Sequence, residues 1–360
     1  MVLLILAAMI VVCPIAQAQL PPTGAPSSWG QVPQGTGACS VGKTCADLAP
    51  GMIRSALGPS PLDENVRALE KILSSRPASA LAGPRAADWV VQAFRQAGAD
   101  QVHEVAFGPA GQSKNVIAEI RGRDYPNDYV LIAAPLNPSR DDSVATSQNA
   151  AVLIDAVRVI HATGNLPRRS IRLVLFATGA EATGSAGGHT AGVWAYIRQH
   201  RAEIDRIAAA VVVDAASGPA NGYSLGNRPD TLANVRKALE PLRSLGVRDF
   251  TEDLKISSEV TPFWLEGVPT LVAMSQGAGD HAEARSRADV VPEGVSPAKL
   301  EQLKHGVAIA AVTAYALADA ESRIGPRQSR AEVRRSIQSM GLETRLKSTG
   351  LWDAWRDSRK

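Results

Sequence analysis

Three near-continuous apolar runs limit the folds that this chain can adopt. They are DYVLIAA at residues 128–134, IRLVLFA at 171–177 and AAAVVVD at 208–214. Such runs are typical of strands buried on both faces of a parallel sheet, because a strand with one face in water alternates polar and apolar residues. A sheet buried in this way needs a layer of helices on each side.

Helical patterns lie between these runs. Apolar residues recur at helical spacing in 61–75, 85–99, 149–162, 192–207, 232–246, 261–267 and 296–322. Another apolar run at 269–274 predicts a further strand, and 101–107 and 115–122 predict a pair of strands. This order predicts an α/β fold, a three-layer αβα sandwich with a mostly parallel central sheet, over residues 60–325.

The first residues have the character of a secretory signal. Residues 1–19 carry no charge, and the apolar run Val2–Cys13 is shorter than the about 20 residues that span a bilayer. Ala16-Gln17-Ala18 is a typical cleavage site. We therefore expect a signal peptide over 1–19 cleaved near Ala18, a secreted or periplasmic protein, and no transmembrane span.

Residues 20–59 are rich in Pro, Gly and Ser, which predicts an extended N-terminal arm. The arm contains Cys39 and Cys45, and a close pair of cysteines in an exported protein predicts a disulfide loop. Such a loop is worth about 2 kcal/mol by the chain-entropy argument. The alternative is a pair of idle thiols; no neighbouring His or second Cys pair indicates a metal site.

The last residues, 326–360, form a basic tail. Ser329 and Glu332 have the spacing of a capping box, so a helix is expected after Ser329. The tail either packs on its own domain or contacts an anionic partner. The net charge of the chain is only +3, aromatic residues make up 4%, and no basic cluster alternates with aromatics, so nucleic-acid binding is not expected.

A ligand site is predicted where the strands end. In parallel α/β sheets, ligands bind beyond the carboxyl ends of the strands. Pro135, Gly179, Asp214 and residues 275–281 follow four of the predicted strands. The sequence therefore places a candidate site at this edge of the sheet.

The stretches KNVIAEIRG, RRSIRLVLFATGAEATGS, AAAVVVD and SSEVTPFWLEGVPTLV, with DH and SPAKLEQL later in the chain, resemble the M28 family of zinc aminopeptidases. The resemblance runs from about Asp63 to Leu317. It implies a zinc aminopeptidase fold of the phosphorylase/hydrolase-like type. It also implies a site for two zinc ions held by His and carboxylate ligands, with a Glu as the general base.

Carried over position by position, the resemblance assigns three metal ligands: Glu181, Asp214 and His281. At the other positions this chain departs from the family. Pro135 replaces a ligand His, Gln148 replaces the bridging Asp, Ala180 replaces the general base, and Asn137 replaces the Asp that orients the His.

These replacements predict that catalysis is lost. Proline has no donor atom in its side chain, glutamine brings no charge to a bridge between two dications, and alanine carries no proton. The loss of the base alone removes roughly 10²–10⁴-fold in rate. We therefore expect a pseudoenzyme, with no zinc or at most one weakly bound zinc, that binds a peptide or protein ligand.

Two alternatives stay open at this stage. One is an active aminopeptidase or other amide hydrolase with an atypical site, in which Glu181, Asp214 and His281 hold a single zinc. The other is the recruitment of Asp141 or Asp142 as substitute ligands, since both follow the lost His closely.

Overall fold

The computed structural model describes residues 43–74, 82–136, 143–178, 190–257, 259–275 and 295–358. The chain divides into two units, residues 1–41 and residues 42–360, and all described residues belong to the second. The predicted signal peptide and most of the predicted arm therefore lie outside the described residues.

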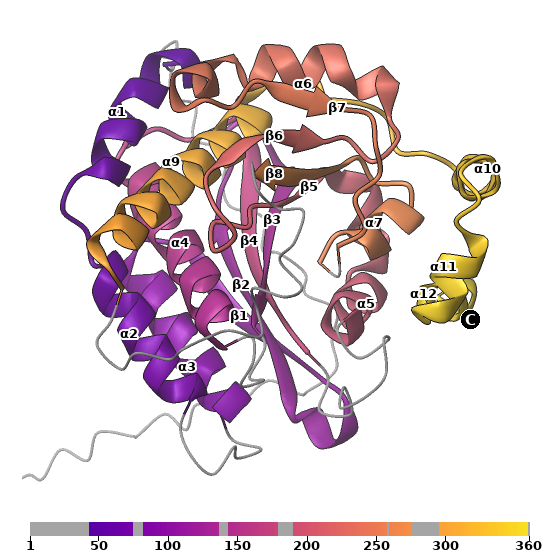
Figure 1. The fold of residues 1–360 in the computed structure, drawn as a ribbon, viewed down its shortest axis with the longest axis horizontal. Coiled ribbons are helices and arrows are strands. Elements are labelled where there is room, and N and C mark those ends of the chain that lie inside the picture. Colours follow the sequence, from indigo (N-terminus) through magenta and orange to yellow (C-terminus); the bar gives the residue numbers. More distant parts are fainter. Residues whose placement is uncertain are drawn as a thin grey trace, which may run out of the picture. The chain divides into compact units, whose positions relative to one another are not determined.

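A sheet of eight strands forms the centre of the described structure (Figure 1), in the order β1-β2-β4-β3-β5-β8-β6-β7. The strands are β1 (Gln101–Phe107), β2 (Ser113–Ile120), β3 (Tyr125–Leu136), β4 (Arg169–Ala177), β5 (Ile207–Val212), β6 (Ala220–Ser224), β7 (Asp249–Thr251) and β8 (Thr270–Ser275). The four central strands β4, β3, β5 and β8 are parallel. The β1–β2 hairpin joins β4 in antiparallel fashion, and β6 joins β8 in the same way.

Helices cover both faces of this sheet (Figure 1). Helices α1 to α4, α6 and α9 share one buried apolar cluster, and α5, α7 and the three C-terminal helices α10 to α12 share another. The helices are α1 (Cys45–Leu57), α2 (Leu62–Leu73), α3 (Ala82–Gln96), α4 (Ser143–His161), α5 (Ala191–Gln199), α6 (Leu232–Ala238), α7 (Thr261–Leu265), α9 (Pro297–Asp319), α10 (Arg330–Ser339), α11 (Glu343–Ser348) and α12 (Leu351–Asp357). The predicted three-layer fold with a parallel centre is confirmed.

The burial of the strands agrees with the sequence pattern. Every residue of β4 is buried, and so are Tyr129–Ala134 of β3. Helices α4 and α9 pack against the middle of the sheet, and they are apolar on nearly all sides. A helix of this kind has to be buried, because no face of it prefers water.

The extended arm predicted over 20–59 is wrong for its C-terminal part, since residues 45–57 form helix α1. The overall Pro, Gly and Ser content concealed a helical spacing of Leu48, Met52 and Ala56, which are buried. Thr44 and Asp47 form a capping box at the start of α1, which satisfies amide groups that a helix end leaves free.

The disulfide predicted between Cys39 and Cys45 is not found at Cys45, which carries a free thiol. Cys45 is the first residue of α1, and its side chain is buried against α9 rather than held in an open loop. Its backbone N–H donates a hydrogen bond to Asp319 of α9, at 3.1 Å. Cys39 lies outside the described residues.

The C-terminal residues pack on their own unit. The predicted capping box is present at Ser329 and Glu332, and α10 follows it. Val333, Ile337, Leu346, Leu351 and Trp355 are buried in the same cluster as α5 and α7. These helices therefore extend the second layer of the sandwich. The short strands β6 and β7, which pair with each other at one edge of the sheet, are absent from the sequence prediction.

Candidate functional site

The carboxyl ends of β3 and β5 lie side by side at the predicted site. Ala133 of β3 is paired with Val212 of β5 in a parallel register. Pro135, near the end of β3, and Asp214, just past the end of β5, each lie two residues beyond this pair. On its other side Pro135 is paired with Phe176 of β4. The two predicted site residues are therefore at the carboxyl ends of adjacent strands.

The first turns of α4 reach the same place. Gln148 and Asn149 are both buried, and the Asn149 side-chain Nδ2 donates a hydrogen bond to Asp214 Oδ1 at 3.0 Å. Gln148 directly precedes Asn149 in the chain. The position that the resemblance assigns to a bridging carboxylate is therefore near Asp214, but it carries a neutral amide.

Both carboxylate oxygens of Asp214 accept hydrogen bonds. Oδ1 accepts from Asn149 and from the backbone N–H of Ser217, the latter at 3.3 Å. Oδ2 accepts from the hydroxyl of Ser217. The two bonds from Ser217 hold the carboxylate to its own loop, as in a capping aspartate, and the bond from Asn149 ties it to α4.

Helix α9 contributes two polar side chains to the same loop. Lys299 Nζ donates to the carbonyl of Ala216, and Gln302 Nε2 donates to the carbonyl of Ala215 at 2.8 Å. Burial lowers the pKa of Lys299, and the negative charge of Asp214 opposes this shift. The Lys299 ammonium therefore lies within the electrostatic reach of Asp214.

The other predicted site residues lie outside the described residues. They are Asn137, Asp141, Asp142, Ala180, Glu181 and His281. Within the described ranges, no three His, Cys, Asp or Glu side chains are grouped so that they could hold a metal ion.

The described part of the site does not fit a pair of zinc ions. Pro135 has no donor, Gln148 has a neutral one, and Asp214 already accepts hydrogen bonds on both oxygens. Zinc prefers thiolate, imidazole and carboxylate ligands. Of the three described positions, only Asp214 has a ligand of this kind.

Sequence reasoning missed Asn149, Ser217, Lys299 and Gln302. Asn149 follows Gln148 directly, and its proximity to a candidate ligand position was a signal for its role. Lys299 and Gln302 are separated from their partners by 83 and 87 residues. No local pattern marks such a contact.

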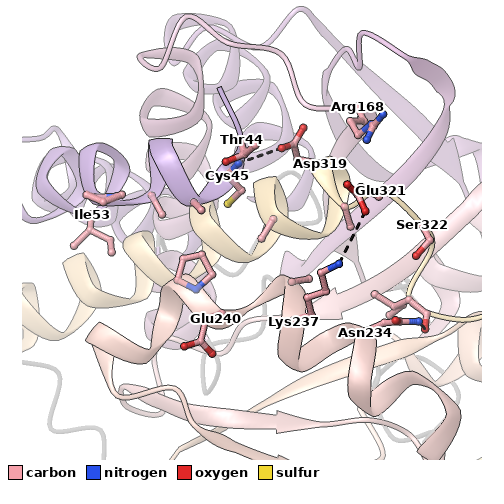
Figure 2. Close-up of a pocket in the computed structure, with 18 of the residues that line it drawn as sticks. Thr44, Cys45, Ile53, Arg168, Asn234, Lys237, Glu240, Asp319, Glu321 and Ser322 are labelled. Carbon is pink, nitrogen blue, oxygen red and sulfur yellow. Dashed lines mark hydrogen bonds and ion pairs between the residues drawn. The ribbon is translucent and has the colours of Figure 1, made fainter. Parts of the chain in front are cut away.

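A pocket of about 900 Å³ lies at a different place (Figure 2), between α1, α6 and the C-terminal end of α9. Arg123 and Arg168, which precede β3 and β4, also line it, so it is at the amino ends of those strands. The predicted site is at their carboxyl ends. Of the residues predicted to matter, the pocket contains only Cys45.

Charges of both signs border this pocket. Lys237 and Glu321 face each other at 4.0 Å (Figure 2), and Arg123 Nη2 lies 3.3 Å from Asp319 Oδ1. Burial, followed by the charge of Asp319, raises the pKa of the Cys45 thiol to about 12. The thiol is therefore protonated at neutral pH, and it lacks the thiolate character of a nucleophile.

Curated relatives match part of the chain. Carboxypeptidase Q of Rattus norvegicus is 24% identical over 219 residues, which are 60% of this chain and 44% of that protein. Carboxypeptidase Q of Xenopus laevis is 28% identical over 167 residues, 45% of this chain and 33% of that protein. The matched region therefore covers less than half the length of each of these relatives. No family model matches it.

Solved structures match the fold over most of the chain. A peptidase M28 precursor from Shewanella amazonensis has a TM-score of 0.63 at 15% identity, over 79% of this chain and 99% of that one. The LapA aminopeptidase of Legionella pneumophila has a TM-score of 0.55 at 16% identity, over 75% of each chain. A glutaminyl cyclase of Macrostomum lignano has a TM-score of 0.50 at 16% identity, over 77% of this chain and 94% of that one.

These neighbours and the curated relatives agree with the motifs in the sequence. The protein therefore has the fold of these solved M28 peptidase and aminopeptidase structures, and its sequence resembles the M28 family.

Proposed function

We propose that this protein is an exported M28-peptidase-like protein that has lost peptidase catalysis and binds a peptide or protein ligand. The observation that carries the proposal is Pro135. It lies near the carboxyl end of β3, where it pairs with Phe176 of β4, at the position where the resemblance calls for a zinc-binding His. A proline at this position offers a metal nothing to bind.

The neighbouring residues support the same conclusion. Gln148 brings no charge to the position of the bridging carboxylate, and Asn149 instead uses its amide to bind Asp214. The resemblance also assigns Ala180 to the position of the general base. In a working site of this kind, metal ions would polarise the scissile carbonyl and activate water. The residues named here supply neither the complete ligand set nor the base.

Export is part of the proposal. It rests on residues 1–19 and the Ala16-Gln17-Ala18 site. Among the helices of the described residues, none is both long and apolar enough to cross a membrane. The intact mass of protein recovered from the host's periplasm or medium tests this step, with a mature chain that begins near Gln19 as the expected result.

The decisive experiment compares the natural chain with a restored one. We expect no measurable release of amino-terminal residues from aminoacyl reporter substrates, with or without zinc, and at most one weakly held zinc per chain by elemental analysis. Pro135→His, Gln148→Asp and Ala180→Glu together should restore two-zinc binding and some turnover. Asn137→Asp should add to this by orienting the new His.

One control separates the base from the metal. Ala180→Glu alone should do little, because a base without a metal-bound water has nothing to activate. Saturable turnover by the natural protein that is lost in His281→Ala would contradict the proposal. That result would favour an amide hydrolase with a single zinc at Glu181, Asp214 and His281.

A further inference from the structure

The loop that follows β5, residues 214–218, is held from two sides by helices far away in the sequence. On one side, Asn149 of α4 makes two hydrogen bonds to it. Its Nδ2 donates to Asp214 Oδ1, and its Oδ1 accepts from the backbone N–H of Ala216, both at 3.0 Å. One amide side chain therefore fixes both Asp214 and the backbone two residues later.

On the other side, α9 presents one face to the loop. Lys299, Gln302 and Gly306 are three and four residues apart, so they lie on the same side of the helix. Lys299 and Gln302 donate to the carbonyls of Ala216 and Ala215. At Gly306, a Cβ atom would lie 2.4 Å from the Cβ of Ala215, so the helix and the loop touch closely there.

The carboxylate at this position also has its hydrogen-bond donors within the chain. A zinc ion beside Asp214 would neutralise the carboxylate, and a carboxylate without a cation or hydrogen bonds is costly to bury. Here the Asp214 oxygens accept hydrogen bonds from Asn149 and Ser217, and the Lys299 ammonium donates to the carbonyl of Ala216, two residues further along the loop. The loop clamp is defined as Asn149, Lys299 and Gln302, which together bind Asp214 and the backbone of the next two residues without a metal ion.

We propose that the loop clamp, and not a metal ion, holds Asp214 and the loop after β5 in place. Asp214 is then an anchor of the loop rather than a zinc ligand, and this edge of the sheet stays organised without metal. The inference deepens the proposed function and rests on it, since a ligand-binding module needs a fixed binding edge even when catalysis is lost.

The first test measures the melting temperature of the full chain with chelator and with added zinc. We expect the natural protein to melt within about 1 °C under both conditions, since no bound metal contributes to its folding. Asp214→Ala should lower the melting temperature by roughly 3–6 °C, equally in chelator and in zinc. Asp214→Asn should lose less, because an amide oxygen still accepts from Asn149.

The second test asks whether Asp214 and Lys299 act on each other. A double-mutant cycle with Asp214→Asn and Lys299→Met should show non-additive shifts, since both side chains fix the same short loop. Lys304→Met on the same helix is the matched control. Lys304 pairs with Glu301 at 3.0 Å rather than with the loop, so its cycle with Asp214→Asn should be additive.

Some results would overturn the inference. A melting temperature that falls by several degrees in chelator, or a bound zinc that Asp214→Ala removes, would make Asp214 a metal ligand. Additive shifts in melting temperature for Asp214→Asn and Lys299→Met would show that Lys299 is not part of the loop clamp. Peptidase turnover by a protein whose melting temperature is unaffected by chelator would overturn the proposed function and leave the loop clamp intact.

Discussion

The guanidinium carbon of Arg172 lies 3.6 Å from the centroid of the Tyr129 ring, between the neighbouring central strands β4 and β3. Arg172 is 1% exposed and also pairs with Glu119 at 2.9 Å and with Glu203 at 2.7 Å. Its Nη1 donates to the hydroxyl of Tyr196. A buried cation of this kind is tolerated because two carboxylates and the Tyr129 ring surround it.

The first prediction concerns this cluster. Arg172→Met should lower the free energy of unfolding by about 3–5 kcal/mol, because it leaves two carboxylates without their cation in a buried site. Adding Glu119→Gln to Arg172→Met should recover part of the loss, since one orphaned charge is removed. Urea unfolding of the three proteins checks this. Equal stability of Arg172→Met and the natural chain would contradict the assigned role.

The second prediction is a loss of stability in mild acid. Burial, together with the charges of Arg172 and His200, lowers the pKa of His103 from 6.5 to about 4 in the folded protein. The unfolded chain therefore binds this proton at higher pH than the folded chain. The free energy of unfolding should fall by about 2 kcal/mol as the pH drops from about 6.5 to about 4.

The neighbouring Glu203 affects the free energy of unfolding at lower pH than His103 does. Burial alone would raise its pKa, but hydrogen bonds to His200 and Arg172 lower it to about 2. Its contribution is fully present above its ordinary pKa of 4.5 and is lost progressively as the pH falls from 4.5 to about 2. Urea titrations of His103→Gln should show a smaller fall over the upper range and the same fall at lower pH. If the free energy of unfolding of His103→Gln fell as steeply between about pH 6.5 and pH 4 as that of the natural protein, His103 would not be the cause of the fall.

The third prediction concerns the thiol of Cys45. Because burial raises its pKa to about 12, it should react with iodoacetamide at neutral pH more than about tenfold slower in the folded protein than in urea. A Cys39→Ser variant isolates this thiol in the mature chain, and peptide mass spectrometry measures its labelling. Equal rates in the folded and unfolded states would show that Cys45 is not buried as described.

The fourth prediction compares two helical glycines. Gly306→Ala should destabilise the protein by about 1–3 kcal/mol, because the new methyl group meets Ala215 at 2.4 Å. Gly51→Ala in α1 is the control. A Cβ there meets nothing within 4 Å, so this change should stabilise the protein by about 0.4–1 kcal/mol. Ala215→Gly should rescue Gly306→Ala, and a failed rescue would place the strain elsewhere.

The sequence by itself determined the layers of the fold and the place of the candidate site. Apolar runs gave β3, β4 and β5, because a strand without polar alternation has to be covered on both faces. Helical periodicity gave α4 and α9. Strand ends then located Pro135 and Asp214 at one edge, since parallel strands end on the same side. Apolar runs, helical periodicity and strand ends are all local patterns, so a single sequence is enough to identify them.

Only the tertiary structure decided how these residues are used. Arg172 lies within an apolar run, and nothing near it in the sequence indicates Glu119 or Glu203 as its partner. Helix α1 was concealed by the composition around it, and its apolar face is explained by packing on α9. Lys299 reaches Ala216 across 83 residues. Contacts of this kind depend on which distant surfaces meet, and that is fixed only when the whole chain has packed.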